Sequence, residues 1–328
     1  MKTRPLITCV GEPLVDFVAT GSKATLEEAP GFVKVCGGEA ANVAVGIARL
    51  GGKAAFVGKV GDDSFGRFIV RELKRENVDV KGVRADKRFK TRLAFVSLTK
   101  TGGRDFEFWE RHPAGGQLRY GDVPMGRVVA SRIVNIGPLL LLKDPARSTA
   151  LRIAREVRKC GCDLAFDPNL RLSLWKSPSE ARRVTRSMVR QCTILRLNGD
   201  EAMFLTGVGD VSATARRLYR LGPQVVIVTI GRQGSYYRVR SGAGLVKGFK
   251  VKPVDTTGCG DGFFAGILLR LAALDEGIKS VSSETMKEIC LYGNAVGALT
   301  ALKRGAVRAL PSGRRVKRFI AEHLSSTR

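Results

Sequence analysis

The chain has 328 residues, 44% of them hydrophobic and 26% charged, which is typical of a globular protein and excludes an intrinsically disordered one. Its 56 lysines and arginines outnumber its 30 acidic residues, so the formal net charge is +26. Only two histidines occur, His112 and His323, and this count argues against a polyhistidine metal site and against a Ser-His-Asp triad.

The positive charge raises the question of a nucleic-acid partner. Basic residues are spread from Arg4 to Arg328, with local density at 87–92, 182–190 and 314–318. No zinc finger, basic zipper or RNA-recognition signature accompanies them. Because such basic runs are usually solvated helix faces, we expect no nucleic-acid partner.

The sequence shows no targeting or membrane segment. The longest apolar run, near 138–142, is too short to cross a bilayer, and the N-terminus lacks the pattern of a signal peptide. The seven cysteines are scattered, and Cys160 and Cys162 are one residue short of a C-x-x-C motif. We therefore expect a reduced, cytoplasmic protein with no membrane partner.

Short apolar runs alternate with amphipathic stretches along most of the chain. The pattern predicts strands at 6–10, 54–57, 133–136, 164–166, 193–197 and 225–230. It predicts helices at 40–50, 64–76, 145–159, 178–190, 211–221, 262–274 and 284–302, and a terminal helix that starts near Pro311. This alternation predicts an α/β fold with a mainly parallel sheet and helices on both faces.

Two segments, 14–35 and 91–109, interrupt this alternation because they are strand-like without an intervening helix. The pair Gly102-Gly103 predicts a hairpin turn within 93–108. Together the segments predict a small accessory sheet, inserted discontinuously into the large domain.

The stretch 255–266 reads DTTGCGDGFFAG and leads into an apolar helix. Residues with small side chains let several backbone N–H groups approach an anion at a helix N-terminus, as a transferred phosphoryl group requires. Asp261 is then a candidate to accept the proton of an attacking hydroxyl. Aspartate is also a common N-cap, and this stretch alone is more often an ordinary capped helix.

A second glycine-rich stretch, 37–44, reads GGEAANVA and opens another helix. Its paired glycines permit the close approach of a hydroxylated ligand, and Asn42 and Asp16 supply hydrogen bonds to it. No Walker A sequence is present, so a phosphoryl-transfer enzyme with this sequence needs a different cradle.

Together these stretches resemble the two signatures of the PfkB, or ribokinase-like, family of carbohydrate kinases, over essentially the whole chain. The region 37–61 fits the first signature, and 255–268 fits the second except at Cys259, where the family has Ala, Gly or Ser. The stretches 11–17, 28–32, 41–51, 166–171 and 304–307 look specifically like fructokinases.

The resemblance implies a ribokinase-like three-layer α/β/α sandwich, with a mainly parallel central sheet and a small β-sheet lid. The large domain would comprise 1–12, 38–90 and 120–328, and the lid would comprise 13–37 and 91–119. The resemblance also implies a homodimer that forms through the lid.

Roles follow for the residues that match. Asp261 would be the general base, and Gly258, Cys259 and Gly260 would surround the transferred group. The implied substrate-side residues are Asp16, Gly37, Gly38, Asn42, Phe106, Phe108, Arg111, Asp167 and Arg171. The implied nucleotide-side residues are Asn198, Thr229, Gly231, Gly234, Gly260 and Asn294. The implied metal ligands are Glu201 for Mg²⁺ through water, and Asp255 and Thr257 for a monovalent cation such as K⁺.

Local structure alone explains several of these residues equally well. Asn198 and Glu201 match an ordinary helix cap with a Glu at N3. Asp167 begins a typical turn sequence. Phe106 and Phe108 alternate as the core-facing residues of a strand do.

We therefore expect an ATP-dependent sugar kinase that phosphorylates a hexose primary hydroxyl, most simply D-fructose to D-fructose 6-phosphate. A second interpretation within the family is a 2-keto-3-deoxygluconate kinase, whose acidic substrate would suit the positive charge. An interpretation from another class is a catalytically silent fructokinase-like protein that binds a partner through its basic surface. The presence of Gly258, Gly260 and Asp261 argues against the silent protein.

Overall fold

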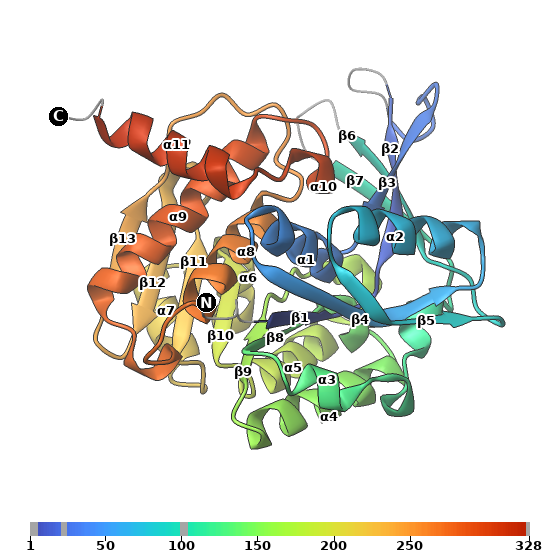
Figure 1. Cartoon of the computed structure of the whole chain (residues 1–328), viewed down its shortest axis with the longest axis horizontal. Helices are drawn as coiled ribbons and strands as arrows, with labels where there is room; N and C mark the ends of the chain where they lie inside the picture. The colour runs from blue at the N-terminus through green and yellow to red at the C-terminus, as the bar shows by residue number, and fades with distance from the viewer. Residues whose placement is uncertain (1–5, 21–24, 99–103, 326–328) are drawn as a thin grey trace.

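The computed structural model describes residues 6–20, 25–98 and 104–325 (Figure 1). Its strands are β1 (Leu6–Val10), β2 (Leu14–Ala19), β3 (Phe32–Gly37), β4 (Lys53–Gly61), β5 (Asp79–Asp86), β6 (Leu93–Leu98), β7 (Arg104–Trp109), β8 (Ile133–Ile136), β9 (Asp163–Phe166), β10 (Ile194–Asn198), β11 (Val225–Thr229), β12 (Gly234–Val239) and β13 (Gly242–Lys247). Its helices are α1 (Glu39–Arg49), α2 (Ser64–Arg75), α3 (Met125–Val128), α4 (Ala146–Lys159), α5 (Pro178–Val189), α6 (Gly199–Thr206), α7 (Val211–Tyr219), α8 (Cys259–Ala272), α9 (Ser283–Ala301), α10 (Ala306–Ala309) and α11 (Gly313–Ser325).

Nine of the strands form one sheet, in the order β13-β12-β11-β10-β9-β8-β1-β4-β5. The pairs from β5 to β11 are parallel, and β12 and β13 add an antiparallel edge. The carboxyl ends of the parallel strands meet at one edge of the sheet, where α/β proteins bind their ligands. The predicted mainly parallel sheet is confirmed.

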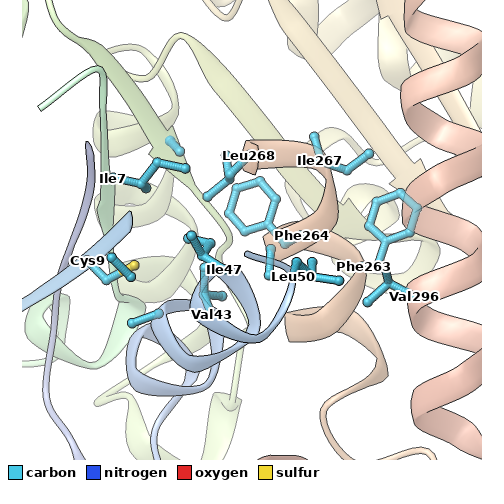
Figure 2. Close-up of a cluster of buried hydrophobic side chains, with 14 of the residues drawn as sticks. Ile7, Cys9, Val43, Ile47, Leu50, Phe263, Phe264, Ile267, Leu268 and Val296 are labelled. Atoms are coloured by element: carbon cyan, nitrogen blue, oxygen red, sulfur yellow. The ribbon is translucent and has the colours of Figure 1, made fainter. Parts of the chain in front are cut away.

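Helices cover both faces of this sheet and bury a separate apolar cluster on each. On one face, α1, α8 and α9 contribute to the cluster that contains Ile7 and Cys9 of β1 (Figure 2). On the other face, α4, α5 and α7 contribute to the cluster that contains Val10 of β1. Successive residues of a strand point to opposite faces, which is why one short strand contributes to both clusters. The result is the predicted three-layer α/β/α sandwich.

The other four strands form a small sheet in the order β3-β2-β6-β7, at one end of the molecule (Figure 1). The pairs β2–β3 and β6–β7 are antiparallel, and the central pair β2–β6 is parallel. The strands come from the two segments that were predicted to form an accessory sheet. The predicted turn at Gly102-Gly103 lies outside the described residues.

Several elements differ from the sequence prediction. The helix α8 begins at Cys259, three residues before the predicted start, because Gly258 takes the positive φ that caps it. The antiparallel edge strands β12 and β13 and the short helix α6 were not predicted. The edge strands contain Gly234, Gly242 and Gly244, and glycines of this kind weaken a strand pattern.

Candidate active site

The turn before α8 leaves its backbone open to a ligand. Gly258 caps the helix with φ +75°, a conformation that glycine adopts without strain, and a Cβ there would lie 2.8 Å from the Cα of Ala306. No side chain among the described residues caps this helix, although the Cys259 N–H donates to the Thr256 carbonyl at 3.3 Å. An uncapped N-terminus presents N–H groups and a positive dipole end to an anion.

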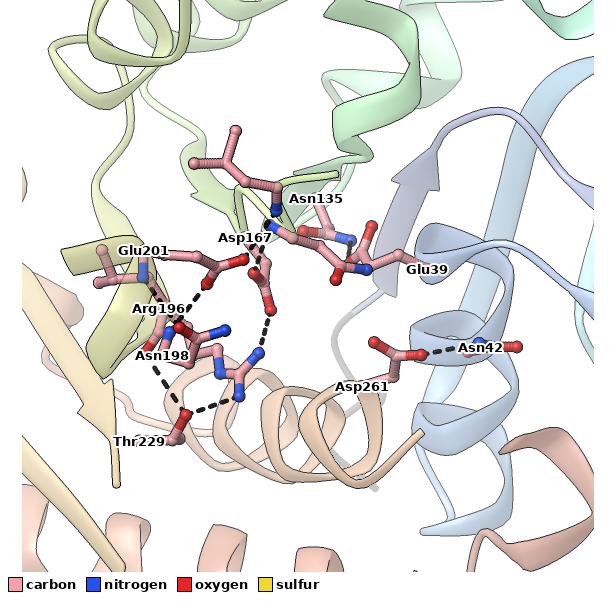
Figure 3. Close-up of polar contacts among 12 residues, drawn as sticks. Glu39, Asn42, Asn135, Asp167, Arg196, Asn198, Glu201, Thr229 and Asp261 are labelled. Carbon is pink, nitrogen blue, oxygen red and sulfur yellow. Dashed lines mark hydrogen bonds and ion pairs between the residues drawn. The ribbon is translucent and has the colours of Figure 1, made fainter. Parts of the chain in front are cut away.

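Asp261 lies in the first turn of α8, opposite Asn42 on α1. Gly46 lets the two helices approach closely, because a Cβ there would lie 2.6 Å from the Cβ of Ala265. Asn42 Nδ2 donates to Asp261 Oδ2 at 2.7 Å (Figure 3). Burial raises the pKa of Asp261 to about 6, and the negative charge of Asp167 adds to the effect of burial. Such a carboxylate is suited to act as a general base.

The glycine pair before α1 brings a carboxylate and the backbone together. Gly38 has φ +96°, and a Cβ there would lie 2.6 Å from the carbonyl oxygen of Glu12. A Cβ on Gly37 would overlap the carboxylate of Asp16, which lies on the neighbouring strand β2. Asn42 follows in the first turns of α1, and its buried Oδ1 has no hydrogen-bond partner among the described residues. That oxygen is a free acceptor for a ligand hydroxyl.

Two aromatic side chains of the small sheet lie toward this region. Phe106 and Phe108 on β7 stack with ring centroids 6.2 Å apart. The Arg171 guanidinium lies 5.4 Å from the Phe106 ring centroid, and the Arg92 guanidinium lies 5.9 Å from that of Phe108. Arg111 follows β7 in an exposed position.

A buried ion pair adjoins the turn on the other side. Arg196 on β10 donates from Nη1 to Asp167 Oδ2 at 2.6 Å and from Nη2 to Thr229 Oγ1 at 2.7 Å (Figure 3). Asp167 is fully buried, and Arg196 is 9% exposed. A Cβ on Gly260 would lie 2.7 Å from Nη1, so glycine at this position lets the guanidinium lie against the first turn of α8.

Glu201 and Asn198 cap α6 reciprocally. Asn198 Oδ1 accepts from the Glu201 N–H, and Glu201 Oε2 accepts from the Asn198 N–H, both at 2.9 Å. Glu201 Oε1 accepts from the Leu170 N–H at 2.7 Å. Burial raises the pKa of Glu201 to about 7, with the charge of Asp167 acting in the same direction. The cap that local sequence predicts is therefore present, next to the buried ion pair.

A cavity of about 650 Å³ opens between α8, α9 and the antiparallel edge. Its lining includes the predicted nucleotide-side residues Thr229, Gly231, Gly234, Gly260 and Asn294, together with Arg196, Cys259 and Phe263. Asn294 Nδ2 donates to the Val246 carbonyl at 3.0 Å and to the Lys247 carbonyl at 3.2 Å, which ties α9 to β13. Asn198 and Glu201 are not part of this lining.

Asp255 holds the start of the turn in place. Its Oδ1 accepts from the Thr257 N–H at 2.9 Å and from the Thr257 hydroxyl at 2.7 Å. Its Oδ2 accepts from the Gly305 N–H at 2.8 Å. These two residues, predicted as monovalent-cation ligands, therefore lie together at the base of the turn.

Two charged side chains of this site, Arg196 and Glu39, were not predicted. Arg196 interrupts an otherwise apolar strand, and that charge is the signal that could have identified it. Glu39 is 6% exposed, its Oε1 accepts from Asn135 Nδ2 at 3.3 Å, and its buried Oε2 has no hydrogen-bond partner among the described residues. Burial raises the pKa of Glu39, with Asp167 and Asp261 adding to this. Acidic residues are common in the first turn of a helix, so nothing in the local sequence marked Glu39 as a site residue.

Among the described residues, no group of three or more His, Cys, Asp or Glu side chains is arranged to hold a metal ion. Over the same residues, no helix is both long enough and apolar enough to span a membrane. The seven cysteines are all free thiols.

Comparison with known proteins identifies relatives over the whole length. "Probable fructokinase-7" from Arabidopsis thaliana is 40% identical over 98% of this chain and 93% of its own. The fructokinase of Xylella fastidiosa with bound ATP has a TM-score of 0.89, at 27% identity over 98% of this chain and 99% of its own. The Vibrio cholerae O395 fructokinase in its fructose-, ADP- and calcium-bound form has a TM-score of 0.87, at 30% identity over 96% and 99%. Residues 4–313 match the pfkB family carbohydrate kinases, and the chain belongs to that family.

Proposed function

We propose that this protein transfers the γ-phosphoryl group of ATP to a primary hydroxyl of D-fructose, giving D-fructose 6-phosphate. The position of Asp261 carries the proposal. Its carboxylate is hydrogen-bonded to Asn42 on one side, and its helix turn lines the cavity on the other. A base between an acceptor site and an anion-binding turn is what phosphoryl transfer to a hydroxyl requires.

Asp261 would remove the proton from the attacking hydroxyl. Asn42 occupies Oδ2, and among the described residues no hydrogen bond is made to Oδ1, which leaves that oxygen for the sugar. With a pKa of about 6, Asp261 is ionised at neutral pH and is a stronger base than an exposed aspartate. The sugar oxygen then attacks the γ-phosphorus, the bond to the β-phosphate oxygen breaks, and ADP leaves.

The amides of residues 258–261 would stabilise the charge on the transferred group, with Arg196 beside them. The adenosine part of ATP would occupy the cavity between α8 and α9, whose volume of about 650 Å³ is in the range of small-molecule sites. ATP as the donor is supported by the ATP-bound fructokinase of Xylella fastidiosa.

Mg²⁺, when bound with ATP, supplies charge neutralisation on the phosphates. Both oxygens of Glu201 already accept backbone N–H bonds, so this residue fits contact with the metal through water rather than direct ligation. Asp255 and Thr257 offer oxygens at the base of the turn, and we propose them as ligands of a monovalent cation. A potassium-bound double mutant of the Vibrio cholerae fructokinase, with a TM-score of 0.87, supports K⁺ in this role.

The acceptor side favours a neutral sugar over 2-keto-3-deoxygluconate. Asp16, Glu39 and Asp261 are acidic. Of the nearby arginines, Arg92 is paired with Glu12 at 2.9 Å, and Arg171 donates from Nη1 to the Leu170 carbonyl at 3.2 Å. A substrate carboxylate would meet this negative surplus, whereas sugar hydroxyls can donate to it. The fructose-bound Vibrio cholerae relative supports the same choice.

The test compares kcat/KM for fructose, 2-keto-3-deoxygluconate, ribose and adenosine in a coupled assay of ADP release. We expect fructose to exceed the others by about tenfold or more, a difference of about 1.4 kcal/mol in transition-state binding. A higher kcat/KM for 2-keto-3-deoxygluconate than for fructose would show that fructose is not the preferred substrate. Absence of turnover, with tight salt-sensitive binding to DNA, would favour the silent binding protein instead.

We also propose that 13–37 and 91–119 act as a lid over the sugar, and that two chains associate through it. Phe32 and Trp109 are 37% and 58% exposed and lie against Phe95 on one face of the small sheet, whereas Val33, on the other face, is 38% exposed. Exposed apolar side chains on one small sheet favour a protein contact. Sedimentation equilibrium should give a dimer for the wild type and a monomer for Val33→Asp; a monomeric wild type would contradict the proposal.

We propose that the protein is cytoplasmic, and the state of its cysteines is the evidence for this location. Cys9, Cys36, Cys192 and Cys290 are buried free thiols, and Cys160 and Cys162 do not pair. Unpaired thiols favour a reducing compartment. Cell fractionation tests the location.

A further inference from the structure

Four chain segments connect the nine-stranded sheet to the small sheet, and all four meet at Glu12. Glu12 itself lies in the first connection, between β1 and β2. Its carbonyl oxygen lies 2.6 Å from the position of a Cβ on Gly38, in the second connection, between β3 and α1. Its Oε1 accepts from Arg92 Nε at 2.9 Å, in the third connection, just before β6. A Cβ on Gly115, in the fourth connection after β7, would overlap the Glu12 side chain.

The Glu12–Arg92 ion pair is buried, and one hydrogen bond joins the two side chains. Glu12 is 2% exposed and Arg92 is 9% exposed. Arg92 bonds Oε1, while Glu12 Oε2 is buried with no hydrogen-bond partner among the described residues. A guanidinium and a carboxylate pair most strongly through two parallel hydrogen bonds. The pair therefore makes one bond of this fork and leaves Oε2 without the second.

Arg92 also connects this joint to the side of the small sheet that faces the site. Its guanidinium lies 5.9 Å from the Phe108 ring centroid, and Phe108 stacks on Phe106. Its carbonyl accepts from the Val15 N–H at 3.1 Å, which ties β2 to the start of β6. Arg92 is therefore in contact with the aromatic side chains and with the strand that carries Asp16.

We infer that Glu12 and Arg92 are positioning residues that set the angle of the lid over the acceptor site and complete their two-bond pairing when the lid closes on sugar. The inference rests on the proposed kinase function and its lid. It adds the residues that control closure. A closed lid excludes water from the site. If the lid does not close fully, water can accept the γ-phosphoryl group of ATP in place of the sugar hydroxyl, and phosphate and ADP are released.

A purely structural role is the alternative, since removing one partner of any buried ion pair destabilises a protein. The chain offers a matched control. Arg49 makes two bonds to Glu76, from Nη2 to Oε1 at 2.6 Å and from Nε to Oε2 at 2.7 Å, between α1 and the end of α2, and both side chains are about a quarter exposed. The variant Arg49→Met removes an arginine from an ion pair without changing Glu12 or Arg92.

The experiment uses tryptophan fluorescence together with kinetics. The chain has two tryptophans, and Trp109 lies on β7 of the lid at 58% exposure. In a Trp175→Phe background, Trp109 is the only tryptophan, so its emission during a fructose titration reports on the lid. The variants are Glu12→Gln, Arg92→Lys and Arg92→Met. Because Arg92→Met leaves a buried carboxylate, Glu12→Gln with Arg92→Met is included as a variant without an unpaired charge.

We expect the joint variants to lower kcat/KM for fructose by about ten- to a hundredfold, because about 1 Å of misplacement in a site can cost up to about a hundredfold in rate. We also expect several-fold more ATP hydrolysed per fructose phosphorylated, and a smaller fructose-dependent change in Trp109 emission. Arg92→Lys should rescue only part of the loss, because an ammonium cannot form the two-bond fork. Arg49→Met should lower the melting temperature and leave these three readouts unchanged.

Joint variants that lower only the melting temperature, as Arg49→Met does, would overturn the inference while leaving the kinase function intact. If the Arg92→Lys variant behaves like the wild type in all three readouts, closure does not depend on two bonds between Glu12 and Arg92. A wild-type protein with no sugar-dependent ADP release would instead overturn the proposed function, and the inference with it.

Discussion

The two sides of Asp261 are built from different chemistry. The acceptor side gathers the acidic residues Asp16, Glu39 and Asp261, with Arg171 close enough to Asp261 to oppose the rise in its pKa. The donor side is an apolar cavity of about 650 Å³ that ends at the uncapped start of α8 and at Arg196. A neutral sugar needs hydrogen-bond acceptors, whereas a nucleotide triphosphate needs an apolar wall and fixed positive charge.

This difference explains why the overall charge of +26 says little about the substrate. The charge that acts on each ligand is local, and it has opposite signs on the two sides of one helix turn. Asp261 belongs to the acceptor side by its bond to Asn42 and to the donor side by its place in α8. Substitutions on each side should therefore affect different kinetic constants.

The largest expected effect is the loss of the base. Asp261→Asn keeps the shape and the neighbour Asn42, but it removes the proton acceptor, so kcat should fall by about 10³-fold, within the 10²–10⁴ range of general-base catalysis. The KM values for fructose and ATP should change by only a few-fold. Steady-state kinetics with circular dichroism as the folding control tests this, and near-wild-type turnover would remove Asp261 from the mechanism.

A second substitution tests the donor side separately from the acceptor side. Arg196→Met leaves Asp167 buried and unpaired, so the free energy of unfolding should fall by about 3–5 kcal/mol. The KM for ATP should rise by about tenfold or more while the KM for fructose stays within a few-fold, because a charged hydrogen bond contributes about 1.5–3 kcal/mol.

Denaturant unfolding and two-substrate kinetics measure these effects. The double variant Asp167→Asn, Arg196→Met removes both charges and should recover much of the stability without recovering ATP affinity. Equal rises in both KM values would show that the two sides are not separable.

The pH profile should report the base. The pKa of Asp261 is about 6, so kcat/KM for fructose should be constant above pH 7 and fall about tenfold per pH unit below pH 6. Glu201, with a pKa of about 7, also becomes protonated as the pH falls. If its protonation lowers activity, the fall in kcat/KM begins at a higher pH. A profile flat to pH 5, in the Asp261 enzyme with its fold intact by circular dichroism, would contradict this assignment.

The sequence predicted the framework of the site better than its electrostatics. Glycine patterns and strand periodicity located the turn at 255–266, the helix of Asn42 and the small sheet, because these depend on local backbone preferences. The Asp167–Arg196 pair and the Glu12 joint join residues 29 and 80 positions apart. Local patterns carry no information on such contacts, and the start of α8 was missed because a glycine cap resembles an ordinary loop.

The smallest expected effect tests the acidic surplus of the acceptor side. Glu39→Gln removes a buried carboxyl while retaining an acceptor for Asn135 Nδ2, and its new NH₂ group can donate to Asn135 Oδ1, which has no partner among the described residues. Burial raises the folded-state pKa of Glu39, so the wild type loses stability as pH rises from the unfolded-state pKa, near 4.5, through the folded-state pKa. The glutamine variant has no such titration. It should therefore be more stable than the wild type at pH 7–8 and show little advantage near pH 4. Thermal unfolding of both proteins at pH 4 and pH 8 measures the difference, and a variant less stable at pH 8 would mean that the Glu39 carboxylate is stabilised in its ionised form.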